Sequence, residues 1–377
     1  MKNSYVPDAR TATDHFPGIG RYVSHLARHL VPLLDANERL LLLHNPQAKT
    51  GWQLPAAQEN VERVATAVSP FSLSQQWHIP RLLRQLNATV YHSAYYLMPY
   101  RPGVPTLLTL YDLIPEQFPQ LVSLQARLLT RLATRLALRA GDHFLAISEA
   151  TRQDFLSYYP LAPAEITAVP LAADEQFKPQ SETAVAAVRQ KLKLPEQYVL
   201  YLGINKPHKN LEQLVAAWAT VTSKLPETPL LLIAGAWDER YGGVKTAVAH
   251  HNLSEKVHFL GRVPDADLPA LYSGAALFVF PSLVEGFGLP VLEAMACGTA
   301  VACSHTSSLP EVGGEAVAYF DPTNSQEIAS VLIALLQDKE KREGLAKKGL
   351  LQAAQFSWEE TAAATLTHYR TLAKLSF

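Results

Sequence analysis

Long apolar runs and cysteines are both scarce in this sequence. No uninterrupted run of about 18 apolar residues occurs, so the sequence predicts no membrane-spanning helix. The only cysteines, Cys297 and Cys303, lie in an apolar stretch, which indicates buried thiols in a reducing compartment and argues against a disulfide or a metal pair. Because the first residues also lack the apolar core of a secretory signal, we expect a cytoplasmic protein.

An excess of charge of either sign is also absent. The chain has 33 Lys and Arg residues against 34 Asp and Glu residues, so nothing attracts it electrostatically to nucleic acid. With 48% hydrophobic and 18% charged residues, the composition is that of a packed globular protein. A length of 377 residues predicts two domains of about 180 residues each.

Short apolar segments that resemble strands alternate with amphipathic helical segments in both halves of the chain. In the first half we expect strands over residues 3–8, 39–44, 61–68, 88–93, 105–112, 143–148 and 166–172, and helices over 19–34, 72–86, 121–140 and 149–158. In the second half we expect strands over residues 198–204, 230–235, 257–261, 276–281, 300–304 and 316–320, and helices over 210–223, 243–251, 266–273, 290–297 and 325–336. This alternation predicts an α/β protein with two doubly wound parallel sheets, which bind ligands at the carboxyl ends of their strands.

The polar stretch at residues 173–182 is the expected join between the two domains. We therefore divide the chain into a first Rossmann-like domain over residues 1–178 and a second over 179–356. A last helix, over residues 357–377, follows the second sheet.

The segment 281–298 is the most informative part of the chain. An expected strand runs into a glycine loop with one carboxylate, Glu285, and Pro290 then opens a helix with a second carboxylate, Glu293, in its first turn. The start of a helix favours a phosphate, whereas carboxylates accept hydrogen bonds from hydroxyls. The combination indicates a sugar nucleotide, although Glu293 alone would also complement the helix dipole and Glu285 alone would be an ordinary solvated residue.

A second glycine turn precedes the helix expected from residue 210. Lys209 lies at the start of that helix, where its ammonium group faces the same cleft as the Glu285 loop and can neutralise a diphosphate. The alternative is a surface lysine, which the positive end of the helix dipole disfavours. Further along, Asp265 and Asp267 resemble a divalent-metal pair, but they open a helix and are better explained as capping residues. We therefore expect neither a metal nor another cofactor.

A dinucleotide-binding enzyme is the main alternative for the first half. Gly18 and Gly20 open a long helix, as in that fingerprint, and either bring the backbone close to a ligand or form a tight turn. The fingerprint also needs a third glycine, where this chain has Val23, and an acidic residue after the second strand, which here ends in His44 and Asn45. The dehydrogenase interpretation fails on both counts.

The segment 281–298 resembles a motif of the retaining glycosyltransferases of family 4, which have the two-domain GT-B fold. The family wording is close to P-S-x-x-E-G-F-G-L-P-V-L-E-A-M-A-C-G, and the resemblance continues through Val312. It implies two Rossmann-like domains facing across a cleft, with the last helix crossing back to the first domain. It also implies that Glu285 contacts the transferred sugar, that Glu293 binds the nucleotide ribose, and that the loop contributes Gly286, Phe287 and Gly288 to donor binding.

The same resemblance assigns donor-binding roles elsewhere. The stretch from Gly203 to Leu211 resembles the family's G-x-x-x-P-R-K-N-L, with His208 in place of the usual arginine. Because histidine is largely neutral at pH 7, donor affinity would be weaker, would depend on pH or would use another cation such as Lys206. The remaining donor-side residues that the resemblance implies are Gly203, Lys209, Val263, Gly18 and Gly20.

The acceptor side departs further from the family. Tyr111-Asp112 stands where the family usually shows His-Asp, and a phenol is no base near neutral pH. Asp112 is then the best side-chain candidate to accept the proton of the acceptor, unless the phosphate of the donor accepts it during same-face attack. His92 ends another expected strand and is either an acceptor-side group or a structural histidine. Glu285, Lys209 and Asp112 form the expected catalytic set.

A basic stripe suggests where the acceptor is found. Arginines recur every fourth residue on one expected helix, at Arg127, Arg131, Arg135 and Arg139. Such a stripe can hold a protein on anionic lipid at the inner face of the cell membrane, where a lipid-linked glycan would lie, or it can be an ordinary solvated face.

Together these features predict a metal-independent, retaining hexosyltransferase. The resemblance favours transfer of mannose from GDP-mannose to a glycan or lipid-linked acceptor, with nucleic acid excluded as a partner. His208 and Tyr111 support the alternative of a catalytically impaired protein that still binds sugar nucleotides.

Overall fold

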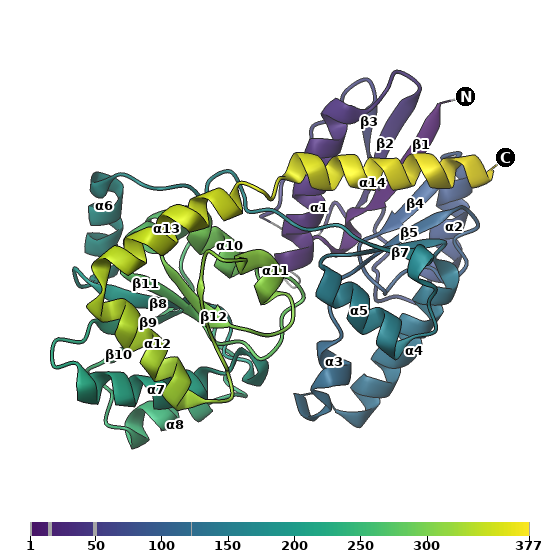
Figure 1. The fold of residues 1–377 in the computed structure, drawn as a ribbon. Helices are drawn as coiled ribbons and strands as arrows, with labels where there is room; N and C mark the ends of the chain where they lie inside the picture. The colour runs from purple at the N-terminus through teal and green to yellow at the C-terminus, as the bar shows by residue number, and fades with distance from the viewer. Residues whose placement is uncertain (1, 14–16, 48–50, 122, 377) are drawn as a thin grey trace. The chain divides into compact units, whose positions relative to one another are not determined.

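The computed structural model describes residues 2–13, 17–47, 51–121 and 123–376 and divides into two compact units. The first unit comprises Met1–Leu171 with Ser357–Phe377, and the second comprises Ala172–Phe356. Each unit contains one parallel sheet with helices packed around it (Figure 1). The predicted architecture, α/β with two doubly wound Rossmann-like domains, is confirmed.

The first unit is built on a seven-stranded sheet in the order β3-β2-β1-β4-β5-β6-β7. Its strands are β1 (Asn3–Asp8), β2 (Glu38–His44), β3 (Val61–Ala65), β4 (Val90–Ser93), β5 (Thr106–Leu110), β6 (His143–Ala146) and β7 (Ile166–Ala168). Its main helices are α1 (Pro17–Leu30), α2 (Gln75–Gln85), α3 (Ile114–Gln117), α4 (Leu124–Ala140), α5 (Glu149–Tyr158) and α14 (Trp358–Ala373). Continuous apolar runs such as Leu40–Leu43 are buried on both faces, as a parallel sheet requires. Strand order reverses between β1 and β4, so the carboxyl end of β1 lies at the switch point.

The last helix, α14, belongs to the first unit, although the second unit precedes it in the sequence. It packs across α1 (Figure 1), and Trp358 stacks on His25 of α1 with ring centroids 4.9 Å apart. Farther along the helix, Arg370 donates hydrogen bonds to both carboxylate oxygens of Glu38, each at 2.8 Å. Helix α14 is therefore an integral part of the first core.

The second unit is built on a six-stranded sheet in the order β10-β9-β8-β11-β12-β13. Its strands are β8 (Tyr198–Leu202), β9 (Leu230–Ala234), β10 (Val257–Gly261), β11 (Leu277–Phe280), β12 (Val301–Ser304) and β13 (Ala318–Phe320). Its helices are α6 (Glu182–Leu192), α7 (Leu211–Lys224), α8 (Gly243–His250), α9 (Leu268–Ser273), α10 (Leu289–Ala296), α11 (Leu309–Gly313), α12 (Ser325–Gln337) and α13 (Lys339–Ala353). Apolar residues of its strands fill the core, including Phe278 and Phe280, which are fully buried.

The join lies seven residues earlier than expected, after Leu171 and not after residue 178. The polar composition of residues 173–182 suggested a solvated linker. Within it, however, Phe177 is buried and packs edge-to-face on Tyr272 of the second unit, at 5.9 Å. One aromatic residue thus ties the linker to the second core.

Several helices have no counterpart in the sequence prediction, namely α3, α6, α11 and α13. Helices α3 and α11 are too short to give a periodic pattern. Helix α13 is rich in charge and buries only Gly349 and Ala353, so it shows no apolar stripe. Among the described residues, no helix combines the length and the apolar character needed to cross a membrane.

Candidate functional site

The loop that follows β11 carries Glu285 and is held in place by two serines. The Ser307 hydroxyl accepts a hydrogen bond from the Glu285 backbone N–H at 2.8 Å. The Ser308 hydroxyl lies 2.9 Å from the Glu285 carbonyl and 2.8 Å from the Phe287 carbonyl, to which it donates. These contacts fix the backbone on both sides of the carboxylate. The carboxylate therefore has a defined position.

Glu285 contacts the lysine that the sequence predicts beside it. Lys209 Nζ donates to Glu285 Oε1 at 2.6 Å, and the two side chains are only 15% and 10% exposed. Lys209 comes from the turn between β8 and α7, so the carboxyl ends of β8 and β11, which are neighbours in the sheet, bring the pair together. A half-buried cation beside a carboxylate can bind an anionic group next to a hydroxylated one.

The second carboxylate, Glu293, is more deeply buried than the sequence suggests. Helix α10 begins at Leu289, one residue before Pro290, so Glu293 lies beyond the first turn and does not complement the helix dipole. It is 2% exposed, and the Tyr272 hydroxyl donates to its Oε2 at 2.9 Å. Gly288 precedes the helix with φ +105°, and a Cβ there would meet the Leu309 side chain at 2.7 Å. Glycine is therefore required at this turn.

His208 is buried and neutral. Burial, followed by the charges of Lys209 and Lys206, lowers the pKa of its imidazole to about 3. A neutral ring at physiological pH cannot replace the permanent charge of arginine. A ring with this pKa does not titrate near neutral pH, which argues against a pH-dependent donor affinity, one of the three alternatives for His208.

A small pocket lies at the carboxyl ends of β8, β9 and β10. Its volume is about 230 Å³, and its lining residues include Gly203, Gly235, Trp237, Phe259 and Gly261. The rings of Trp237 and Phe259 meet edge-to-face at 5.3 Å, and Lys245 Nζ lies 4.6 Å from the centre of the Trp237 ring. A Cβ on Gly235 would meet the Gly203 carbonyl at 2.2 Å, so only glycine allows these two turns to touch. Such a pocket accommodates a planar, partly polar group.

The other predicted residues of the second unit have structural contacts. Val263 is buried, and the buried Phe287 ring packs on Phe356 at 5.8 Å, which leaves mainly backbone atoms to meet a donor. Asp267 precedes α9 without a capping hydrogen bond, which corrects the capping interpretation. Its carboxylate instead pairs with Lys191 Nζ at 2.6 Å.

In the first unit, His92 is a structural residue. Its Nδ1 lies 2.7 Å from the Tyr369 hydroxyl of α14, and its Nε2 lies 2.8 Å from the Thr109 hydroxyl. Burial lowers the pKa of the ring to about 3. Because both ring nitrogens are engaged in the core, the structure places no part of His92 at an acceptor.

The Tyr111-Asp112 pair is divided between the interior and the solvent. The Tyr111 ring packs edge-to-face on Tyr22 at 5.8 Å, and burial raises the pKa of its phenol well above the usual range. Asp112 is exposed, and its Oδ1 accepts a hydrogen bond from the Ile114 N–H at 3.1 Å. The Tyr111 hydroxyl is buried, so Asp112 presents the more accessible polar group of the two.

Gly18 and Gly20 lie within the first turn of α1 and not before it. A Cβ on Gly20 would meet the Trp52 indole at 2.2 Å, whereas a Cβ on Gly18 would meet none of the described residues within 4 Å. Close packing therefore explains Gly20, and the space around Gly18 remains open to a ligand.

Comparison with known proteins identifies the family. Residues 17–177 match Glycosyltransferase Family 4, and residues 186–352 match Glycosyl transferases group 1. The O-antigen chain mannosyltransferase B of Escherichia coli is 30% identical over 375 residues, which cover 94% of this chain and 96% of that protein. The chain belongs to the family 4 glycosyltransferases.

Solved structures agree on the fold of this family 4 glycosyltransferase. Sucrose-phosphate synthase from Thermosynechococcus elongatus has a TM-score of 0.77 at 22% identity, covering 98% of this chain and 99% of that one. HepE from Anabaena, in complex with UDP and glucose, has a TM-score of 0.76 at 19% identity and covers 98% and 100%. At such identities the likeness shows the GT-B fold alone.

Only part of the arginine stripe of the glycosyltransferase is exposed to solvent without a nearby carboxylate from Glu116. On α4, Arg127 and Arg131 lie 4.0 and 3.7 Å from the buried carboxylate of Glu116, whereas Arg135 and Arg139 are exposed. The sequence did not predict that leucines of the same helix are exposed, and Leu124, Leu128, Leu129 and Leu132 are each more than half exposed. Helix α4 therefore presents apolar side chains together with positive charge.

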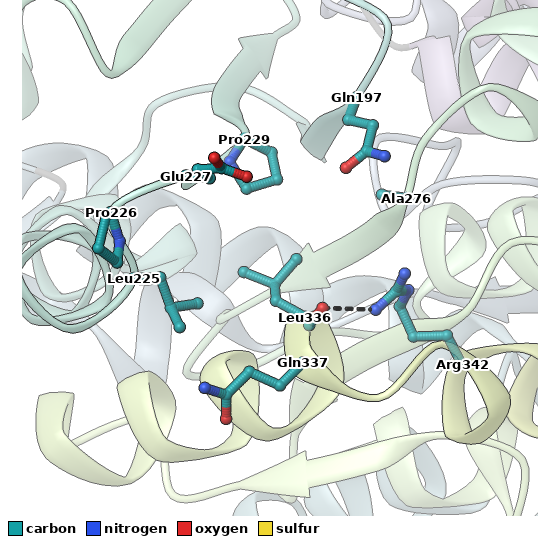
Figure 2. A pocket seen from close by; sticks show the side chains of 9 residues that line it. All are labelled: Gln197, Leu225, Pro226, Glu227, Pro229, Ala276, Leu336, Gln337 and Arg342. Carbon is teal, nitrogen blue, oxygen red and sulfur yellow. Dashed lines mark hydrogen bonds between the residues drawn. The ribbon is translucent and has the colours of Figure 1, made fainter.

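The glycosyltransferase also has a roomier pocket, of about 440 Å³, away from the candidate site (Figure 2). Its lining includes Gln197, Pro229 and Ala276, each of which directly precedes a strand of the second sheet. It therefore lies at the amino ends of the strands, the edge opposite Glu285 and Lys209. Size alone does not make it the active site, because ligands of parallel sheets bind at the carboxyl ends.

The serines at 307 and 308 are site residues that the sequence prediction missed. They belong to the stretch that resembles the family's S-S-L-P-E-V, so the signal was present, but it gave no indication of their role. The role depends on hydrogen bonds that span 21 to 23 residues of sequence.

Proposed function

We propose that this enzyme transfers mannose from GDP-mannose to a glycan or lipid-linked acceptor, with retention of configuration and without a metal ion. The observation that carries the proposal is the 2.6 Å contact between Lys209 and Glu285 at the carboxyl edge of the second sheet. The names of similar proteins favour mannose, since both the O-antigen chain mannosyltransferase B and WbdA of Escherichia coli are mannosyltransferases. WbdA is 35% identical over 226 residues, which cover 59% of this chain and 28% of that protein.

In this proposal the donor displaces the contact between Lys209 and Glu285. The lysine binds the diphosphate and stabilises the charge that develops as the diphosphate departs. The carboxylate, released from the lysine, accepts hydrogen bonds from the sugar hydroxyls and orients the anomeric carbon. Glu293 binds the ribose hydroxyls, for which it must exchange its contact with Tyr272.

The aromatic pocket supports a purine base in particular. A volume of about 230 Å³ is too small for a whole nucleotide sugar but fits a base against Trp237 and Phe259. Glu239 also lines the pocket, and a carboxylate can accept both the N1–H and the N2–H of guanine. Uracil offers only one such donor. This difference favours GDP over UDP.

The proton of the acceptor hydroxyl has two possible destinations. In same-face substitution the departing phosphate oxygen accepts it, and no protein base is needed. Asp112 is an exposed carboxylate of the first unit and the side chain we propose as a base. Replacement by asparagine separates the two routes, because a true base costs about 10²-fold or more in kcat.

Contact with an anionic membrane surface is a further part of the proposal. Helix α4 exposes leucines beside Arg135 and Arg139, the combination by which an amphipathic helix lies in a lipid interface. Wild-type protein should sediment with vesicles that contain phosphatidylglycerol, and the variant Leu128→Ser/Leu132→Ser should not. Equal sedimentation of both proteins would contradict this part of the proposal.

The experiment that tests the central proposal is a transfer assay with GDP-mannose, UDP-glucose and ADP-glucose in the presence of EDTA. A manno-oligosaccharide serves as the acceptor, and NMR identifies the anomer of the product. We expect GDP-mannose alone to give an α-linked product. Transfer only from another donor, or only after addition of a divalent metal, would overturn the donor or the metal assignment.

A further inference from the structure

An exposed apolar surface lies on the first unit, where β3 leads into α2. It consists of Phe71, Leu73 and Trp77, which are 61%, 80% and 68% exposed, and we refer to these three residues as the Trp77 ledge. Backbone hydrogen bonds from Gln76 N–H to the Leu73 carbonyl and from Trp77 N–H to the Ser74 carbonyl form a helical turn. Leu73 and Trp77 are four residues apart on this turn and therefore share one face.

The ledge is held by a buried ion pair. Arg10 is 1% exposed, and its guanidinium donates to Asp8 Oδ2 at 2.6 Å, to the Val68 carbonyl at 3.0 Å and to Gln75 Oε1 at 3.2 Å. One cation thus joins the end of β1, the loop after β3 and the first residue of α2. The stretch from Asp8 to Arg10 thereby fixes this loop.

A second set of contacts holds the other side of the turn. Gln76 Nε2 donates to the Met98 carbonyl at 3.0 Å, and Gln76 Oε1 accepts from the Tyr100 N–H at 2.8 Å. Since the backbone is fixed on both sides, the exposure of Phe71, Leu73 and Trp77 is a property of the folded surface. A fixed, exposed apolar group of this kind marks an interaction site.

The position of the ledge suits a substrate. It follows β3 and is bound through Arg10 to the carboxyl end of β1, which lies at the switch point of the first sheet. Ligands of such sheets bind outside the carboxyl ends of the strands. The ledge therefore lies at the edge of the first sheet where, by this rule, a ligand is expected.

The composition of the ledge indicates what it binds. From Val64 to Pro80 the chain has no Asp, Glu, Lys or Arg, and serines at 69, 72 and 74 alternate with the ledge residues. Anionic membranes attract clusters of cations, and α4 has four arginines, whereas α2 has two, Arg81 and Arg84, both exposed and both beyond the ledge. Aromatic faces flanked by hydroxyl groups suit a neutral chain of sugars, because pyranose rings present C–H groups on one face and hydroxyls around the rim.

We propose that the Trp77 ledge binds the neutral sugar chain of the acceptor, with sugar rings packed on Trp77 and Phe71. The inference rests on the proposed function, since it takes the acceptor to be a glycan. The ledge would hold sugars at a distance from the reacting hydroxyl and so favour a longer chain over a monosaccharide.

The test compares wild type with Trp77→Ala, Trp77→Phe and Phe71→Ala, using an α-linked mannose pentasaccharide and free mannose as acceptors. We expect Trp77→Ala to raise KM for the pentasaccharide about tenfold, which corresponds to about 1.4 kcal/mol, with kcat within about twofold. Trp77→Phe should restore most of the affinity, and the pentasaccharide should change the tryptophan fluorescence of wild type but not of Trp77→Ala. Leu351→Ala is the matched control, because Leu351 is 73% exposed on α13 of the second unit.

Three results would overturn the inference. They are an unchanged KM in Trp77→Ala and Phe71→Ala, an equal rise in KM for free mannose, and a loss of vesicle binding in Trp77→Ala without a change in KM. Stabilisation of each variant by GDP is measured separately. If GDP does not stabilise the wild-type protein, the proposed donor is contradicted, whereas the proposal for the ledge is not.

Discussion

The two units use their polar residues in opposite ways. In the second unit, Lys209 and Glu285 lie at the carboxyl edge of the sheet, where a ligand can exchange with either group. In the first unit, His92 and Arg10 are buried at the same kind of edge and hold the core together. The first unit exposes apolar side chains at the Trp77 ledge, and apolar side chains together with arginines along α4. This difference is the one expected if the second unit binds a charged donor and the first unit binds a neutral acceptor.

The largest effect should come from the charged pair of the second unit. We expect Glu285→Gln and Lys209→Met each to lower kcat/KM for transfer by about 10²–10³-fold, because each removes a group that stabilises charge or orients the sugar. Steady-state assays with saturating acceptor measure this change. The control is Lys224→Ala, at the far end of α7, which should stay within about twofold. A loss of less than about fivefold in both site variants would contradict the assignment of the catalytic pair.

The next effect should be on the stability of the first unit. His92→Ala leaves the hydroxyls of Tyr369 and Thr109 without their ring partner, which should cost about 1–3 kcal/mol in the free energy of unfolding. Tyr369→Phe removes only one of the two contacts and should cost about 1 kcal/mol. Urea unfolding measures both variants. GDP should still stabilise both variants. A variant that folds normally but no longer binds GDP would contradict the assignment of His92 to the core of the first unit and of donor binding to the second.

Acid should destabilise both units through their neutral histidines. Burial lowers the pKa of His92 in the folded protein to about 3, against an ordinary value of 6.5, so the unfolded chain binds an extra proton between these values. The stabilising contribution of the neutral ring is complete above pH 6.5 and is lost as the pH falls toward about 3. The slope is about 1.4 kcal/mol per pH unit for each such histidine. His92→Gln should show a correspondingly smaller slope in urea titrations from pH 4 to 6.5, and an unchanged slope would contradict the assignment.

The smallest effect should come from His208. Because this ring stays neutral above pH 5, we expect His208→Gln to change the Kd for GDP by no more than about twofold. Calorimetry from pH 5.5 to 8 should give the same pH dependence for both proteins. Two results would assign His208 to donor binding. One is a tenfold loss of affinity for GDP in His208→Gln, and the other is a wild-type affinity that falls as the pH rises through neutrality.

Sequence patterns predicted the features that short stretches of chain determine, namely the strands and the two loops of the candidate site. Apolar runs such as Leu40–Leu43 gave the strands, and the glycine loops gave the facing positions of Lys209 and Glu285. The patterns failed where a partner is distant in sequence, because packing determines such a contact. His92 meets Tyr369 across 277 residues, and no local pattern distinguishes it from a histidine that faces a substrate. The sequence did not predict the ledge for a related reason. Whether an apolar side chain is exposed depends on whether other parts of the fold pack over it, which a local pattern does not show.

The contribution of α14 to the first core has a consequence for the order of folding during synthesis. The residues of the second unit are contiguous, whereas the first unit lacks its last helix until residues 357–377 have been made. We therefore expect the second unit to complete its fold first, although domains generally fold in the order of their synthesis. Until α14 arrives, the face of α1 that receives Trp358 and the ring of His92 remain uncovered. A nascent chain in that interval is the form most in need of a chaperone.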